Sequence, residues 1–108
     1  MKIKTIDLNG KVTDETFYPS DGTSLQGQVD ASYAEIVSVF GNDITNDGYK
    51  VDAEWTINTP DGIARVYNYK DGKNYLGEFG LDVEEIRDWH IGGAKKDVVQ
   101  WVLLALKK

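Results

Sequence analysis

The amino-acid sequence predicts an α+β fold, in which two helices pack on one face of an antiparallel sheet of four to five strands. Two β-prone runs, Tyr49 to Ile57 and Ile63 to Tyr69, flank a turn and form the central hairpin. The two helices are predicted from a capping-box sequence and from a strongly apolar last segment. We expect one domain over residues 1–108, because this length buries a core without metals or disulfides.

Residues 1–19 are predicted to form a hairpin, because Asn9-Gly10 is the strongest two-residue turn signal. The apolar alternation in this segment is poor, which indicates either edge strands or a mobile arm. Thr23 to Val29 follows as a short strand or an ordered loop.

The first helix is predicted from Ser32, which lies three residues before Glu35 in the spacing of a capping box. Gly41 favours the left-handed backbone that ends a helix. An apolar stripe with helical spacing lies between them: Tyr33, Ile36, Val37 and Phe40.

The central strand is predicted from the strict alternation of Tyr49 to Ile57, which places Asp52, Glu54 and Thr56 on a wet face. Thr59-Pro60-Asp61-Gly62 has the residues of a tight turn, since proline presets φ and glycine accepts a positive φ. Ile63 to Tyr69 returns as the partner strand.

Three shorter elements are expected after this hairpin. Asn74 to Phe79 is predicted as a third strand or a looser excursion, and Leu81 to Ile86 as a helical turn capped by Asp82. Arg87 to Ile91 alternates and is expected to pair with the sheet.

The last helix is predicted from Ala94 to Leu106, with apolar residues over roughly 200° of its surface, against the ~100° or more typical of a surface helix. Two alternatives follow. Either this helix is buried between the sheet and another element, or part of it faces a second copy in a homodimer.

The composition excludes several function classes. The net charge of −6 argues against direct nucleic-acid binding and suits a partner protein with a basic surface. With no cysteine and one histidine, no metal or cofactor is expected. No signal-peptide pattern is present, and the longest apolar run is far too short to span a membrane. We therefore expect a cytoplasmic protein that does not contact a membrane.

A ligand site is one interpretation of the segment that starts with Trp89. Paired glycines at the start of a helix let the backbone approach a phosphate, nucleotide or carboxylate, which lysines would attract. Alternatively, the glycines only turn the chain and the tryptophan fills the core. The candidate ligand-binding residues are Trp89, His90, Gly92, Gly93, Lys95 and Lys96.

An acid–base role for His90 is the enzymatic interpretation, because Asp88 lies two residues away on the same strand face. No serine has the context of an activated nucleophile. A structural or solvent-facing histidine is the alternative, and no catalytic residue is assigned.

A surface for a partner protein is predicted from carboxylates on the wet strand face and from nearby tyrosines and an arginine, the residue types that dominate binding hot spots. The carboxylates have two alternatives, a glycosidase-like pair or a simply solvated sheet face. The candidate partner-binding residues are Asp52, Glu54, Asp61, Arg65, Tyr67, Tyr69 and Tyr75.

Residues 23–93 resemble a group of small phage and prophage proteins without an established activity. The resemblance is carried by Thr23-Ser24-Leu25-Gln26-Gly27, Phe40-Gly41, the Tyr49 to Trp55 strand, the Tyr67 to Tyr75 segment and Asp88-Trp89-His90-Ile91-Gly92-Gly93. It implies a viral setting, in which small acidic proteins are often inhibitors of host defence, such as anti-CRISPR or anti-restriction proteins.

Three hypotheses on function follow from the sequence. The first is a non-enzymatic binding protein, a phage-derived inhibitor of a host defence protein that acts through an acidic and aromatic surface. The second is a small-ligand binder or nucleotide sponge that uses the glycine pair. The third is an enzyme that uses His90 and a carboxylate.

Overall fold

A computed structural model describes residues 3–15, 23–43 and 52–108. In these residues a six-stranded mixed sheet has the strand order β2-β1-β4-β5-β6-β3, and three α-helices accompany it. The elements are β1 (Ile3–Ile6), β2 (Val12–Glu15), β3 (Ser24–Asp30), α1 (Tyr33–Phe40), β4 (Glu54–Thr59), β5 (Gly62–Tyr67), α2 (Lys73–Leu76), the 3-10 helices η1 (Gly77–Phe79) and η2 (Val83–Glu85), β6 (Asp88–Gly93) and α3 (Asp97–Ala105).

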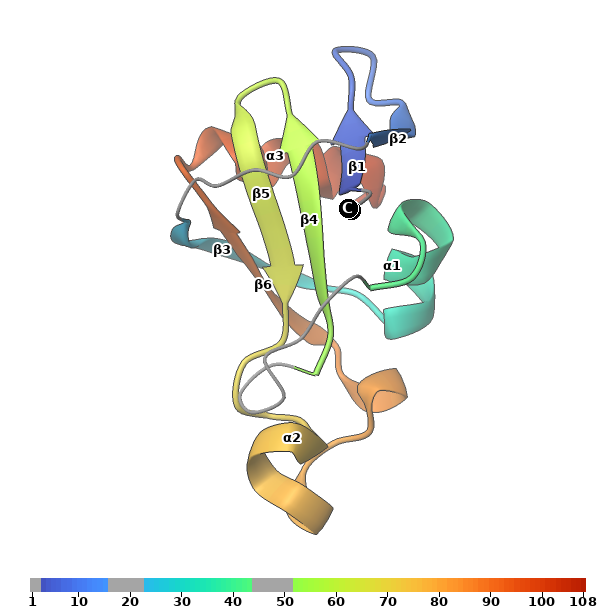
Figure 1. Ribbon diagram of the computed structural model, residues 1–108, viewed down its shortest axis with the longest axis vertical. Helices are drawn as coiled ribbons and strands as arrows, with labels where there is room; N and C mark the ends of the chain where they lie inside the picture. Colours follow the sequence, from blue (N-terminus) through green and yellow to red (C-terminus); the bar gives the residue numbers. More distant parts are fainter. Residues whose placement is uncertain (1–2, 16–22, 44–51) are drawn as a thin grey trace.

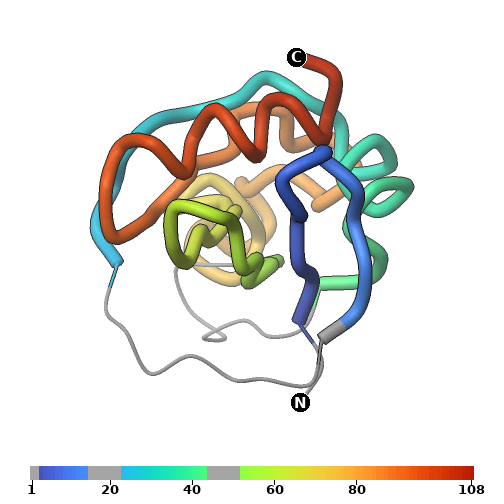
Figure 2. Tube along the Cα trace, turned by 90° about the horizontal axis from the view of Figure 1, so that it is seen from above, coloured from blue at the N-terminus to red at the C-terminus, as the bar shows by residue number. Residues whose placement is uncertain are grey.

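The two longer helices lie against the sheet, whereas α2 lies away from it (Figure 1). Figure 2 shows α3 running along one side of the molecule, with the β1–β2 hairpin beside its end. Buried residues of α1 and α3 join those of β4, β5 and β6 in one hydrophobic core. The α+β class is therefore confirmed, with both long helices contributing to the same core.

The sheet differs from the prediction because it has six strands and is mixed. β1 lies parallel to β4, with Lys4 opposite Ile57 and Thr5 opposite Asn58, while the other four pairings are antiparallel. Local patterns reveal hairpins, but a parallel pair joins segments far apart in the chain and has no local signal. The segment predicted as a short strand or an ordered loop forms β3, and the alternating segment expected to pair with the sheet forms β6. These two strands pair with each other.

The central strand is shorter at its start than predicted. β4 begins at Glu54, and the predicted start from Tyr49 to Val51 lies outside the described residues. The strand face predicted to be exposed to solvent is only partly exposed, because Thr56 is buried. The turn prediction is confirmed: Thr59 pairs with Gly62, and Gly62 has a φ of +122°.

Two predictions for the segment after β5 have opposite outcomes. Of the two alternatives for Asn74 to Phe79, the strand is wrong, because α2 and η1 occupy these residues in an excursion from the sheet. The capped turn is confirmed as η2, where Asp82 and Glu85 form a capping box. The sequence of residues 74–79 has no alternation of apolar and polar side chains, which a half-buried strand needs. The main-chain hydrogen bonds of this segment are instead made within single helical turns.

Two tryptophans at the centre of the core anchor both ends of α1. The indole N–H of Trp89 donates to the carbonyl oxygen of Ala31 before the helix, at 2.9 Å. The indole N–H of Trp55 donates to the carbonyl oxygen of Gly41 after it, at 2.8 Å. The two rings meet edge to face at 5.4 Å, and Tyr33 lies over both. This geometry is favourable for aromatic pairs.

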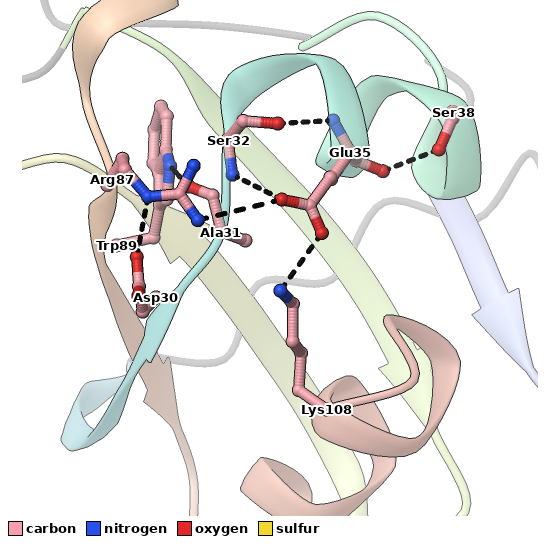
Figure 3. Close-up of polar contacts among 8 residues, drawn as sticks. All are labelled: Asp30, Ala31, Ser32, Glu35, Ser38, Arg87, Trp89 and Lys108. Atoms are coloured by element: carbon pink, nitrogen blue, oxygen red, sulfur yellow. Dashed lines mark hydrogen bonds and ion pairs between the residues drawn. The ribbon is translucent and has the colours of Figure 1, made fainter.

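The start of α1 is fixed by the predicted capping box. The Ser32 hydroxyl accepts from the N–H of Glu35 at 3.1 Å, and the Glu35 carboxylate accepts from the N–H of Ser32 at 3.0 Å. Figure 3 shows that the same carboxylate also meets Lys108 at 3.0 Å and Arg87 at 3.8 Å. These contacts lower the pKa of Glu35 to about 2, chiefly through the Ser32 backbone and then Lys108.

The last helix begins at Asp97, three residues later than predicted. Val98, Val102 and Leu106 are buried in the core, whereas Leu104 is 57% exposed. Packing within the domain therefore explains why the central part of the apolar surface of this helix, around Val98 and Val102, is apolar. A second copy against the Leu104 side stays a prediction.

Replacement of Trp89 by phenylalanine (Trp89→Phe) is expected to lower the free energy of unfolding by about 2–4 kcal/mol, measured by urea denaturation. The change leaves the carbonyl of Ala31 without its donor in a buried position and removes ring volume from the core.

Trp101→Phe is the matched control for this change. Its indole N–H donates to the Asp61 carboxylate at 2.7 Å in a partly exposed position, where water can replace the donor. We expect a loss of about 1 kcal/mol. Equal losses in the two variants would contradict a special role for the Trp89 hydrogen bond.

Glu35 is expected to make the free energy of unfolding depend on pH in the acidic range. Its pKa in the folded protein, about 2, is below its ordinary value of 4.5, so the unfolded chain binds more protons between these values. The stability due to Glu35 is present above about pH 5 and is lost as the pH falls toward about 2. The difference in unfolding free energy between the wild type and Glu35→Gln should shrink over this range.

The control is Glu78→Gln, because Glu78 is exposed and forms no ion pair among the described residues. Chemical denaturation at a series of pH values compares the two variants. A constant difference between Glu35→Gln and the wild type across the range would contradict the assignment.

Candidate functional site

The candidate site is an aromatic strip that starts on the face of the sheet opposite α3 with Tyr67, His90 and Tyr69 and continues through Lys70 to Tyr75 of α2. Tyr67 and His90 lie directly opposite each other on β5 and β6. Alternate residues of a strand point to opposite faces, so His90 faces outward while its neighbours Trp89 and Ile91 are buried in the core.

The histidine ring of the strip lies between two tyrosine rings. His90 meets Tyr67 edge to face at 5.5 Å and stacks on Tyr69 at 6.1 Å with 25° between the planes. Such contacts add a preferred geometry to the burial of the rings. The arrangement therefore presents tyrosine edges in fixed positions.

Lys70 extends the strip toward Tyr75. Its ammonium lies 5.2 Å from the centre of the Tyr69 ring and 5.4 Å from that of Tyr75, within the range of cation–π attraction. Tyr69 and Tyr75 are 41% and 37% exposed, so this end of the strip is open to a partner. Lys70 was absent from the sequence prediction, because a lone lysine in a turn carries no signal.

The electrostatics of the strip favour the neutral form of Tyr67. Burial raises the pKa of Tyr67, and the nearby charge of Glu54 raises it further. Glu54 lies directly opposite Tyr67 in the pairing of β4 with β5. Arg65 lies on the same face, and its guanidinium donates to the Thr23 hydroxyl at 3.1 Å. Four of the seven predicted partner-binding residues thus share this face.

Asp52 has a structural contact that sequence reasoning missed. The buried Asn68 carboxamide donates to the Asp52 carboxylate at 3.0 Å and accepts from the backbone N–H groups of Asp52 and Ala53. The other Asp52 oxygen accepts from the backbone N–H of Asn74 at 3.3 Å. Asp52 therefore holds the chain after β5 in place, rather than lying on the wet face of a strand.

Asp61 lies at the other end of the molecule from Tyr75. It follows Pro60 in the β4–β5 turn, where it accepts from the Trp101 indole at 2.7 Å and lies 3.7 Å from Lys95. In Figure 1 this turn is at the top and α2 is at the bottom. The structure therefore separates Asp61 from the rest of the predicted partner surface.

The six candidate ligand-binding residues do not converge on one site. Gly92 and Gly93 lie in β6 and not at a helix N-terminus, which corrects the predicted placement. Trp89 is buried with its N–H bonded to Ala31, so its ring is not available for stacking on a ligand. His90 faces the opposite side of the sheet, while Lys95 and Lys96 are exposed between β6 and α3.

The acid–base interpretation also lacks its geometry. No hydrogen bond or ion pair joins Asp88 to His90, both of which lie in the described residues, and His90 contacts tyrosines instead. In the same residues no group of three or more histidine or carboxylate side chains could hold a metal ion. The described helices include none long and apolar enough to cross a membrane.

Comparisons with known proteins returned nothing: no family model, no curated protein and no solved structure matches this chain.

The glycine pair has a packing role that a single substitution tests. A Cβ at Gly93 would lie 2.3 Å from Cγ2 of Val98, so alanine must push α3 from the sheet. We expect Gly93→Ala to lower the free energy of unfolding by about 1–3 kcal/mol in urea denaturation.

Gly92→Ala is the matched control. Its Cβ would lie 3.3 Å from a Tyr67 ring carbon and 3.4 Å from the Thr23 hydroxyl, contacts that small shifts relieve. We expect a loss below about 1 kcal/mol. A larger loss for Gly92→Ala than for Gly93→Ala would contradict this account.

Proposed function

We propose that this chain is a non-enzymatic protein-binding module that docks on a partner protein through the aromatic strip. The observation that carries the proposal is the stack of Tyr67, His90 and Tyr69 on the outer sheet face, continued by Lys70 and Tyr75. Tyrosines bury large amphipathic surface with few rotatable bonds, which makes them effective anchors of interfaces.

Two further features support docking on a protein over binding of a small molecule. The rings of the strip follow one another in a row from the sheet to α2, whereas small-molecule sites enclose the ligand in a concave pocket. Its rings are also already fixed by mutual contacts, which reduces the entropy lost when a partner binds. The predicted ligand residues, in contrast, are divided between the core and two surfaces.

The resemblance to small phage proteins gives the proposal its narrower form. In that setting the partner is a host defence protein, such as a CRISPR or restriction component, and docking inhibits it in the host cytoplasm. The net charge of −6 suits a partner that itself binds nucleic acid through a basic surface.

The test is a double variant, Tyr69→Ser with Tyr75→Ser, in co-purification from host lysate with quantitative mass spectrometry. Both rings are partly exposed, so the fold should persist while an anchoring pair is removed. We expect the specific partner to be depleted by about tenfold or more relative to the wild type.

Leu8→Ala is the control, because Leu8 is 78% exposed in the β1–β2 turn, away from the strip. Identical partners for the wild type and the double variant would refute docking through the strip. The narrower form has a separate readout in a bacterium with an active CRISPR or restriction system. There the wild type should raise phage plaque counts and the double variant should not.

A further inference from the structure

The segment between β5 and β6 exposes apolar side chains that the sequence analysis did not assign to a site. Residues 72–81, here called the lobe, project at the end of the molecule opposite the β4–β5 turn (Figure 1). Phe79 is 86% exposed, and Leu76 and Leu81 are each 42% exposed. Single exposed apolar residues are ordinary, but several within one short segment mark an interaction surface.

The lobe is a closed excursion with its two ends in contact. Gly72 and Leu81 form a parallel bridge, and the N–H of Leu81 donates to the carbonyl of Asp71 at 3.0 Å. A Cβ at Gly80 would lie 2.3 Å from the carbonyl oxygen of Gly72, so the backbones approach as closely as glycine allows. The apolar side chains are therefore presented on a preorganised support, which lowers the entropy loss of docking.

The surroundings of the lobe are negatively charged. Its one described ion pair joins Lys73 to Asp82 at 3.0 Å, while Glu78 and Glu84 form no ion pair among the described residues. A hollow of about 370 Å³ between the lobe and α1 is lined by Leu81, by one cation, Lys73, and by four carboxylates: Asp43, Asp52, Asp82 and Glu84. The exposed apolar surface thus continues into a negative hollow.

The hydroxyl of Tyr33 on the wall of this hollow responds to that charge. A hydrogen bond to Asp43 at 2.8 Å, burial, and the charges of Asp43 and Glu84 raise the pKa of Tyr33 to about 12. Because four carboxylates and one lysine line the hollow, it favours a further positive charge.

We propose that the lobe is an anchor, which inserts Phe79 into an apolar pocket of the partner protein while a lysine or arginine beside that pocket enters the acidic hollow. The proposal rests on the proposed function and adds the chemistry of the partner surface. Charge complementarity favours a partner protein with a basic residue over a second copy of this chain or an anionic membrane. A second copy docked lobe to lobe would oppose like charges, and an anionic membrane surface would be repelled.

The probe for this proposal is a displayed library of random short peptides, selected on the full-length chain. We expect enriched peptides that combine lysine or arginine with aliphatic or aromatic residues. Their affinity should fall about 30-fold or more for Phe79→Ala, the loss typical of a hot-spot residue. Leu8→Ala is the matched control, because Leu8 is 78% exposed in the β1–β2 turn, and it should bind as the wild type does.

The charge component is tested with Glu78→Lys combined with Glu84→Lys, which should weaken the same peptides, as should rising salt. Each of the following results would overturn the proposal: enrichment of neutral or acidic peptides, affinity independent of Phe79, no enrichment above the Phe79→Ala chain, or binding to phosphatidylserine vesicles. A solution mass that doubles in the wild type but not in Phe79→Ala would assign the lobe to a second copy instead, which also overturns it.

The outcomes separate this proposal from the proposed function. If the Tyr69→Ser and Tyr75→Ser variant loses its lysate partner while Phe79→Ala keeps it, the strip docks and the lobe is not the anchor. If Phe79→Ala alone loses both the peptides and the partner, the lobe anchors and the strip does not. Because Phe79 is 86% exposed, unfolding does not explain a loss, and an unchanged urea transition verifies this.

Discussion

The two indole hydrogen bonds at the ends of α1 are the constraint on which the rest of the structure depends. Trp89 and Trp55 lie on different strands, so the bonds to Ala31 and Gly41 fix the helix relative to β6 and β4 at once. The pairing of β3 with β6 places Val29 opposite Trp89, which brings the chain to the helix start in the right register. A one-residue slip of β6 or of β4 would turn the indole on that strand to the wrong face of the sheet.

This arrangement commits one sheet face to packing against the helices and places the aromatic strip on the other. On β6, Trp89, Ile91 and Gly93 meet the helices, while His90 meets the tyrosines of the strip. The glycine pair illustrates the same division, since Gly93 makes room for Val98 of α3 and Gly92 lies beside Tyr67. The sequence DWHIGG therefore encodes packing and surface in alternation rather than one ligand loop.

Elements with local signals were predictable from the sequence, and those that depend on distant contacts were not. The Ser32–Glu35 capping box and the turn before Gly62 have physical causes within a few residues, and both were predicted. The parallel pairing of β1 with β4 joins distant segments and left no local trace. At the candidate site, the tyrosines were predicted from composition, but their stacking on His90 depends on strand register. For Phe79 the sequence left a strand and a looser excursion open, because its exposure depends on the contact between Gly72 and Gly80.

One buried side chain joins the aromatic strip to the lobe. Asn68 lies between Tyr67 and Tyr69 in the chain, and its carboxamide donates to Asp52 and Asp71 while accepting two backbone N–H groups. Asp52 in turn accepts from the first turn of α2. A buried amide with all its hydrogen bonds made has one orientation, so it sets the strip and the lobe in a fixed relation. Two exposed surfaces held by one rigid hub favour simultaneous contact with a single partner over independent contacts with two.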